Sequence, residues 1–260
     1  MRRVRSRVGG GAALNLARSV GVSPGARAVA RDDRKQSGGA LRRHCVAAES
    51  VVALALPLAW NNRVLPALDL PLRGRTVAHT VFAVGYVAVF GGRPKWLSAS
   101  GFRWGIGSSA VVLAGYAVAL SIPAVRRVPL EVAERVPETS TLEWIALHIP
   151  VGTVLAEEAV FRGTLDRLLD DAFGPSAPVL AALDFGLWHV HPARVAGDSV
   201  AATVLATTAA GLVFGVLRRR TGSATAPALL HLAINIGGAL MPVAARWIEE
   251  LMGRSARSAT

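Results

Sequence analysis

Apolar residues occur in long runs along this chain, and short polar or basic stretches separate the runs. In the first half they cover residues 45–60, 77–91 and 109–125, each about 15 to 17 residues long. A helix that crosses a bilayer needs roughly 20 such residues, and each run can be extended through its flanks toward that length. The pattern therefore predicts three membrane-spanning helices in this half.

The second half is also apolar, and it opens with a helix start signal. Ser140, followed three residues later by Glu143, matches a capping box, which predicts a helix running through His148 toward Phe161. Pro150 is expected to distort this helix, because proline lacks a backbone N–H and its ring clashes with the preceding turn. Three further apolar runs cover residues 177–190, 199–217 and 223–248.

These runs predict an all-α fold, a polytopic transmembrane bundle of about seven helices. Hydrophobic residues make up 52% of the chain and mean hydropathy is +0.41, both high for a soluble domain. Aromatic residues are only 6%, so the apolar mass is Ala, Val and Leu, which suit a helix in hydrocarbon better than a barrel. We therefore expect a multi-pass protein of the cell membrane. Its expected regions are a basic tail at 1–44, N-terminal transmembrane helices at 45–135, a second helical region at 140–250 and a C-terminal tail at 251–260.

The net charge of +12 is concentrated in the first of these regions. Residues 1–44 hold ten Arg and Lys35 against Asp32 and Asp33, a net charge of +9. Such a tail usually stays on the cytoplasmic side and can contact anionic lipid headgroups. A solvated, disordered arm without a partner, an organellar transit peptide and a misassigned start codon are alternatives. Nucleic acid is not an expected partner, because no aromatic or motif context accompanies the arginines.

Three charges interrupt the helix predicted to begin at Ser140, namely Glu157, Glu158 and Arg162. Each would cost roughly 2.5 to 3.5 kcal/mol at mid-membrane depth, so they require partners or a water-filled cavity. Glu158 and Arg162 are four residues apart and can pair on one helix face, which leaves Glu157 without a local counter-ion. A carboxylate so placed can exchange protons. Alternatively, this helix end emerges into water, where Glu157 and Asp166 would be solvated.

Two later segments carry imidazoles. Phe185 is followed by His189 at the end of one apolar run, and His231 is followed by Asn235 in the last run. His231 and Asn235 are four residues apart, so they lie on one helix face. An interfacial histidine at 189 and a packing pair at 231 and 235 are alternatives. Cys45 is the only cysteine, so no intrachain disulfide or multi-cysteine metal site can form.

The combination of these groups supplies what amide hydrolysis needs. Glu157 can activate a water that His189 orients, and His231 with Asn235 can stabilise the oxyanion. The same side chains could instead hold Zn²⁺ or another divalent metal, with His189, His231 and Glu157 as ligands, because two His and a carboxylate form a recognised catalytic zinc set. The residues leave metal-dependent and metal-free mechanisms open.

At this point the sequence resembles a known family. Glu-Glu-Ala-Val-Phe-Arg-Gly at 157–163, Phe-x-x-x-His at 185–189 and His-x-x-x-Asn at 231–235 are similar to the three motifs of the CAAX prenyl protease and bacteriocin-processing (CPBP, Abi) family. The resemblance implies a catalytic domain over residues 140–250 of an intramembrane endopeptidase, either a metalloprotease or a glutamate-type enzyme. It implies that Glu157 is the base with His189 as its partner, that His231 and Asn235 serve an oxyanion or a metal, and that Glu158 and Arg162 are structural.

The expected partners are a peptide or membrane-protein substrate and the lipid bilayer. Peptide processing, membrane-protein turnover and self-immunity to a bacteriocin are all compatible with the family, and the resemblance does not rank them. The excess of Arg over Lys is typical of a GC-rich bacterial genome, where prenylated substrates are not expected. A non-catalytic membrane scaffold that retains the motifs for packing is an alternative from another class, and so is a transporter-like protein, although we find no internal repeat.

Overall fold

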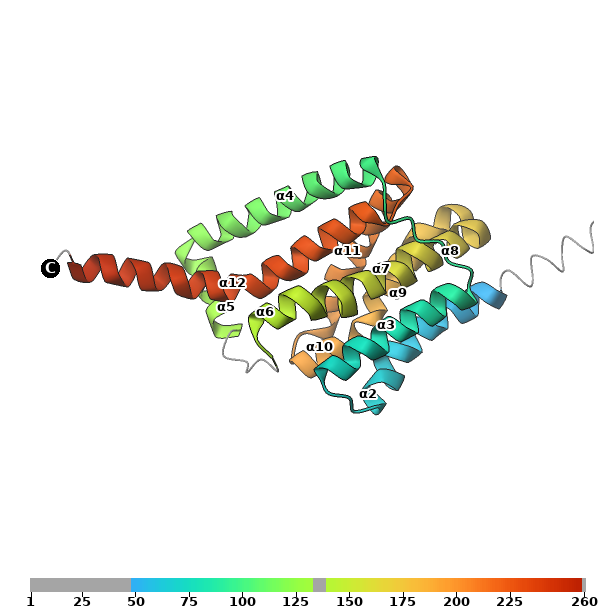
Figure 1. Ribbon diagram of the computed structural model, residues 1–260, viewed down its shortest axis with the longest axis horizontal. Helices are drawn as coiled ribbons and strands as arrows, with labels where there is room; N and C mark the ends of the chain where they lie inside the picture. Colours follow the sequence, from blue (N-terminus) through green and yellow to red (C-terminus); the bar gives the residue numbers. More distant parts are fainter. Residues whose placement is uncertain (1–47, 133–138, 259–260) are drawn as a thin grey trace, which may run out of the picture. The chain divides into compact units, whose positions relative to one another are not determined.

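Helices form all the regular secondary structure in the part of the chain that the computed structural model describes, residues 48–132 and 139–258 (Figure 1). The chain divides into two units, residues 1–44 and residues 45–260, and the description concerns the second. Within the described residues there are seven main helices and no strand, which confirms the predicted all-α bundle. The basic tail predicted at 1–44 lies outside the described residues.

The N-terminal half has a helix at each of the three predicted runs, but the bounds of the second and third helices differ from those predicted. Within the described residues of this half, only the third helix is long and apolar enough to cross a membrane. The helix through residues 48–59 continues as a π-helical turn, η1 (Trp60–Val64), and then as α2 (Leu65–Ala67). Next come α3 (Leu72–Val89), α4 (Ala99–Ser121) and α5 (Pro123–Val132). The start of α4 lies ten residues before the predicted 109, because Ser98 caps it by accepting a hydrogen bond from the Gly101 backbone N–H.

The helix predicted from Ser140 is one continuous helical path made of alternating α and π stretches. The Ser140 hydroxyl accepts a hydrogen bond from the Glu143 N–H at 3.2 Å, which confirms the cap. The distortion expected at Pro150 takes the form of a π-helical stretch that contains it. The elements are α6 (Thr141–Glu143), η2 (Trp144–Leu155), α7 (Ala156–Val160), η3 (Phe161–Leu165) and α8 (Asp166–Phe173).

The last helices complete the bundle. They are α9 (Ala177–Trp188), α10 (Val190–Ala196), α11 (Val200–Thr221) and α12 (Thr225–Ser258). Gly222 takes a left-handed conformation (φ 62°) and ends α11, a position that suits glycine because it has no Cβ. The helix α12 includes residues 251–258, which were predicted to form a separate C-terminal tail. Gly253 does not take the left-handed conformation that ends many helices, and no proline follows Pro242.

Four helical segments in the described residues are long and apolar enough to cross a membrane: Ala99–Ser121, Thr141–Ala196, Val200–Thr221 and Thr225–Arg254. Large apolar side chains such as Val111 and Leu205 are more than 70% exposed on them, as expected where lipid is the solvent. The protein is therefore a multi-pass membrane protein. Close helix contacts use small residues, and α4 runs beside α12 (Figure 1), where Gly105 meets Leu229 and Ala226.

Candidate active site

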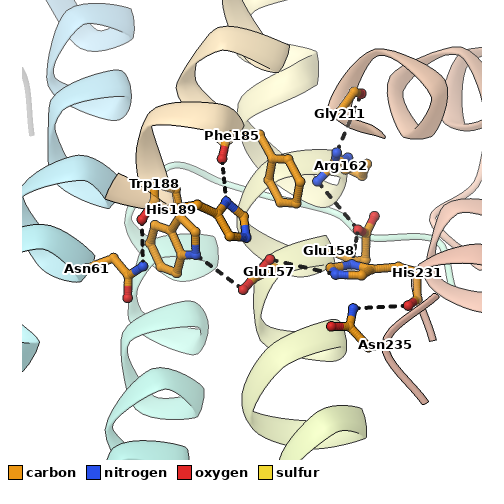
Figure 2. Close-up of polar contacts among 10 residues, drawn as sticks. All are labelled: Asn61, Glu157, Glu158, Arg162, Phe185, Trp188, His189, Gly211, His231 and Asn235. Atoms are coloured by element: carbon orange, nitrogen blue, oxygen red, sulfur yellow. Dashed lines mark hydrogen bonds and ion pairs between the residues drawn. The ribbon is translucent and has the colours of Figure 1, made fainter. Parts of the chain in front are cut away.

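Two consecutive buried glutamates lie on α7, between the π-helical stretches η2 and η3. Glu157 is 6% exposed and Glu158 is completely buried. Consecutive residues on a helix point about 100° apart, so the two carboxylates face different neighbours (Figure 2). Glu157 faces the end of α9, and Glu158 faces Arg162 and α12. Because Asp166 is also buried, the alternative in which this helix end emerges into water is wrong.

Glu158 is shared by a guanidinium and an imidazole. Its Oε1 lies 2.9 Å from His231 Nδ1 and 3.4 Å from Arg162 Nη1, which confirms the predicted i,i+4 pair. The guanidinium carbon of Arg162 also lies 4.2 Å from the ring centre of Phe185 and 4.8 Å from that of Phe214, distances at which a cation is attracted by an aromatic face. The contact of Glu158 with His231 was not predicted from the sequence.

The two oxygens of Glu157 have different surroundings. Oε1 accepts a hydrogen bond from Trp188 Nε1 at 3.2 Å. Oε2 is buried, has no hydrogen-bond partner among the described residues, and lies 3.9 Å from His231 Nε2. Trp188 was missed in the sequence, although it directly precedes His189 and indole N–H groups usually find a partner when they are buried.

His189 lies against the Phe185 ring, and Asn235 lies next to His231 (Figure 2). The Nδ1 of His189 is 2.8 Å from the Phe185 carbonyl oxygen, to which it donates in one tautomer, and this leaves Nε2 for other partners. Among the described contacts, no hydrogen bond joins its imidazole to Glu157 or His231. Asn235 Nδ2 donates to the His231 carbonyl oxygen at 3.1 Å. The three motifs thus meet in space, from α7, the end of α9 and α12.

A cavity of about 680 Å³ lies beside this cluster, bounded by η1, α2, α3, η2 and α10. Polar side chains reach it from η1, α3, η2 and α10. His79 forms part of its wall and also lies against Trp188, with ring centres 5.6 Å apart. The cavity is therefore separated from Glu157 by the His79 and Trp188 side chains. Its lining includes Asn61, Thr76, His79, His148, Thr153 and His191.

The predicted metal ligands are Glu157, His189 and His231, and the contacts of the described residues do not join all three. Among residues 48–132 and 139–258, no three His, Cys, Asp or Glu side chains come together as a metal site. His231 turns Nδ1 to Glu158, and only its Nε2 faces Glu157. His189 joins neither of them by a direct contact. Metal binding by Glu157, His189 and His231 therefore stays a prediction.

The fold and the site together define a multi-pass membrane protein that encloses a polar cluster within its helices. Residues 139–237, which carry all three motifs, match the family of type II CAAX prenyl endopeptidase Rce1-like proteins. The match confirms the resemblance to CAAX-type membrane proteases over this segment. Comparison with curated proteins gave no match, and comparison with solved structures gave none.

Proposed function

We propose that this protein is an intramembrane endopeptidase in which Glu157 acts as the general base. The observation that supports this most directly is the placement of Glu157 Oε2, which is buried, accepts no hydrogen bond from the described residues, and lies 3.9 Å from His231 Nε2. That separation is longer than a direct hydrogen bond and suits a bridging water. The membrane-protease family of residues 139–237 supports the reaction class.

Glu157 would take a proton from this water as the water oxygen bonds to the scissile carbonyl carbon. The Trp188 N–H on Oε1 holds the carboxylate in place, so that Oε2 is the oxygen that accepts the proton. His189 would accept a hydrogen bond from the same water through Nε2, because its Nδ1 is directed to the Phe185 carbonyl. These contacts orient the water before it attacks.

His231 and Asn235 would stabilise the oxyanion that forms as the carbonyl electrons move to oxygen. When both nitrogens of His231 are protonated, Nδ1–H donates to Glu158 and Nε2–H is left for the oxyanion. Glu158 stabilises this imidazolium in the way that a triad carboxylate does. Asn235 uses one Nδ2 hydrogen for the His231 carbonyl and retains the other.

The intermediate collapses when the C–N bond breaks and protonated Glu157 passes its proton to the leaving nitrogen. This restores the carboxylate and yields one new carboxyl group and one new amine. The peptide would bind in the 680 Å³ cavity, whose lining mixes apolar residues such as Leu65 and Val195 with hydrogen-bonding residues such as Thr153. It would reach Glu157 when the His79 and Trp188 side chains, which separate the cavity from Glu157, move aside. Peptides and membrane proteins are the proposed substrate class.

The test compares the parent protein with Glu157→Gln in liposomes, using a quenched peptide library and mass spectrometry of the products. We expect cleavage to fall at least about a hundredfold, the usual scale of general-base catalysis. Glu250→Gln, at an exposed position of α12, makes the same chemical change outside the site and should cleave like the parent. Near-parental cleavage by Glu157→Gln would show that another group is the base.

A further inference from the structure

Two asparagines that lie outside the family-matched segment hold the junction between α9 and α10. Asn61 and Asn62 belong to the π-helical turn η1, and they reach across to the chain around residue 188. These contacts join residues that are 125 to 129 positions apart in the sequence. The junction carries both Trp188 and His189, the two α9 groups of the candidate active site.

Asn62 replaces a helical hydrogen bond that the junction has lost. In a continuous helix, the His191 N–H would donate to the Leu187 carbonyl four residues earlier. Here the His191 N–H donates to Asn62 Oδ1 at 2.8 Å, and Asn62 Nδ2 donates to the Leu187 carbonyl at 3.0 Å. The Asn62 amide therefore satisfies both the donor and the acceptor of the missing backbone hydrogen bond.

Asn61 replaces a donor that the sequence itself lacks. The Trp188 carbonyl would accept from the N–H of residue 192, but residue 192 is proline and has none. Asn61 Nδ2 donates to that carbonyl at 2.7 Å, in a buried position. Because unsatisfied backbone groups are strongly disfavoured within a membrane protein, this contact fixes where the chain can turn.

Trp188, whose carbonyl Asn61 binds, also contacts the proposed base, Glu157. The backbone carbonyl of Trp188 accepts from Asn61, while the indole N–H of the same residue donates to Glu157 (Figure 2). His189 is the next residue, so it lies between two positions that the asparagines hold. A shift of the junction would move the indole and the imidazole relative to Glu157 together.

We infer that Asn61 and Asn62 are positioning residues, which act on the reaction by setting the placement of Trp188 and His189. The inference rests on the proposed function for its catalytic consequence. Loss of the Asn61 amide should lower kcat, because Glu157 is no longer oriented by a fixed indole. The effect of Asn61 on kcat should depend on the presence of the Trp188 indole.

The experiment is a double-mutant cycle in liposomes with Asn61→Ala, Trp188→Phe and the double variant, each normalised to folded protein. We expect each single change to lower kcat by about tenfold and the double variant to be little worse than either single one, because both remove one linked interaction. Tyr86→Phe is the matched control. The Tyr86 hydroxyl on α3 donates to the Ala53 carbonyl, on the helix that leads into η1. This buried hydrogen bond does not involve the junction, so its loss should leave kcat within about twofold.

A second measurement does not depend on activity. Amide hydrogen exchange at His191 should be faster in Asn62→Ala than in the parent, and unchanged in Tyr86→Phe. Multiplicative effects of Asn61→Ala and Trp188→Phe, or an unchanged His191 exchange rate, would overturn the inference. If His191 amide exchange responds as expected but Glu157→Gln keeps full cleavage, the proposed function has failed. The role of Asn61 and Asn62 in holding the junction between α9 and α10 then still stands.

Discussion

The structure distinguishes the two adjacent glutamates, and Glu158→Gln is the change that tests this distinction most directly. Glu158 is fully buried, and its Oε1 contacts both Arg162 Nη1 and His231 Nδ1. Replacing it with Gln leaves a guanidinium without its carboxylate. Breaking a buried pair in this way costs on the order of 3 to 5 kcal/mol.

We expect a loss of about 3 kcal/mol, at the lower end of that range, because the aromatic rings around Arg162 continue to stabilise the cation. Activity should fall as well, since His231 loses the carboxylate that supports its imidazolium. Glu157→Gln should behave differently. Its stability should change by less than about 1 kcal/mol, because the Gln carbonyl can still accept from Trp188.

The assay measures thermal unfolding in detergent together with peptide cleavage for Glu157→Gln, Glu158→Gln and the exposed control Glu250→Gln. Two further variants complete a double-mutant cycle: Arg162→Gln alone, and Glu158→Gln with Arg162→Gln. The double variant removes both buried charges and should recover part of the lost stability, with a coupling of about 0.5 to 3 kcal/mol. Equal unfolding temperatures for Glu158→Gln and the parent would refute the assigned pairing. So would a double variant whose loss equals the sum of the two single losses.

Three further outcomes follow from the geometry. His189→Gln should lower kcat by about a hundredfold with folded yield near the parental value, because the side chain's one described hydrogen bond is to a carbonyl of its own helix; unchanged kcat would remove it from the mechanism. The proposed side-chain mechanism predicts that cleavage survives dialysis against EDTA, and loss of activity that Zn²⁺ restores would show instead that the side chains hold a catalytic metal. Gly105→Ala should destabilise the fold by about 1 to 3 kcal/mol in detergent melts, because its Cβ would lie 2.7 Å from Leu229 Cδ1 and 3.2 Å from the Ala226 Cα. Gly107→Ala, on the same helix with nothing within 4 Å of the added Cβ, should be neutral or stabilising, and equal losses for the two would show that packing against α12 is not the cause.

The sequence by itself determined the class of fold and the identities of the polar residues. Apolar runs separated by basic stretches are sufficient to predict membrane helices, because backbone groups in lipid must be satisfied within each helix. Ser140 predicted its own helix start, since a cap is a local interaction over three residues. Glu157 and Glu158 stood out because charges are costly in such runs, and the spacing of His231 and Asn235 placed both on one face.

Only the tertiary structure decided which groups meet. Local spacing pairs Glu158 with Arg162 and assigns Glu157 no partner, whereas in the structure the 100° between them sends Glu157 to Trp188 and Glu158 also to His231. The Asn61 contact with the Trp188 carbonyl spans 127 positions, and no local pattern reports a contact at that separation. Such pairings depend on how whole helices pack, because a partner is chosen by shape and by the need to satisfy buried polar groups across the bundle.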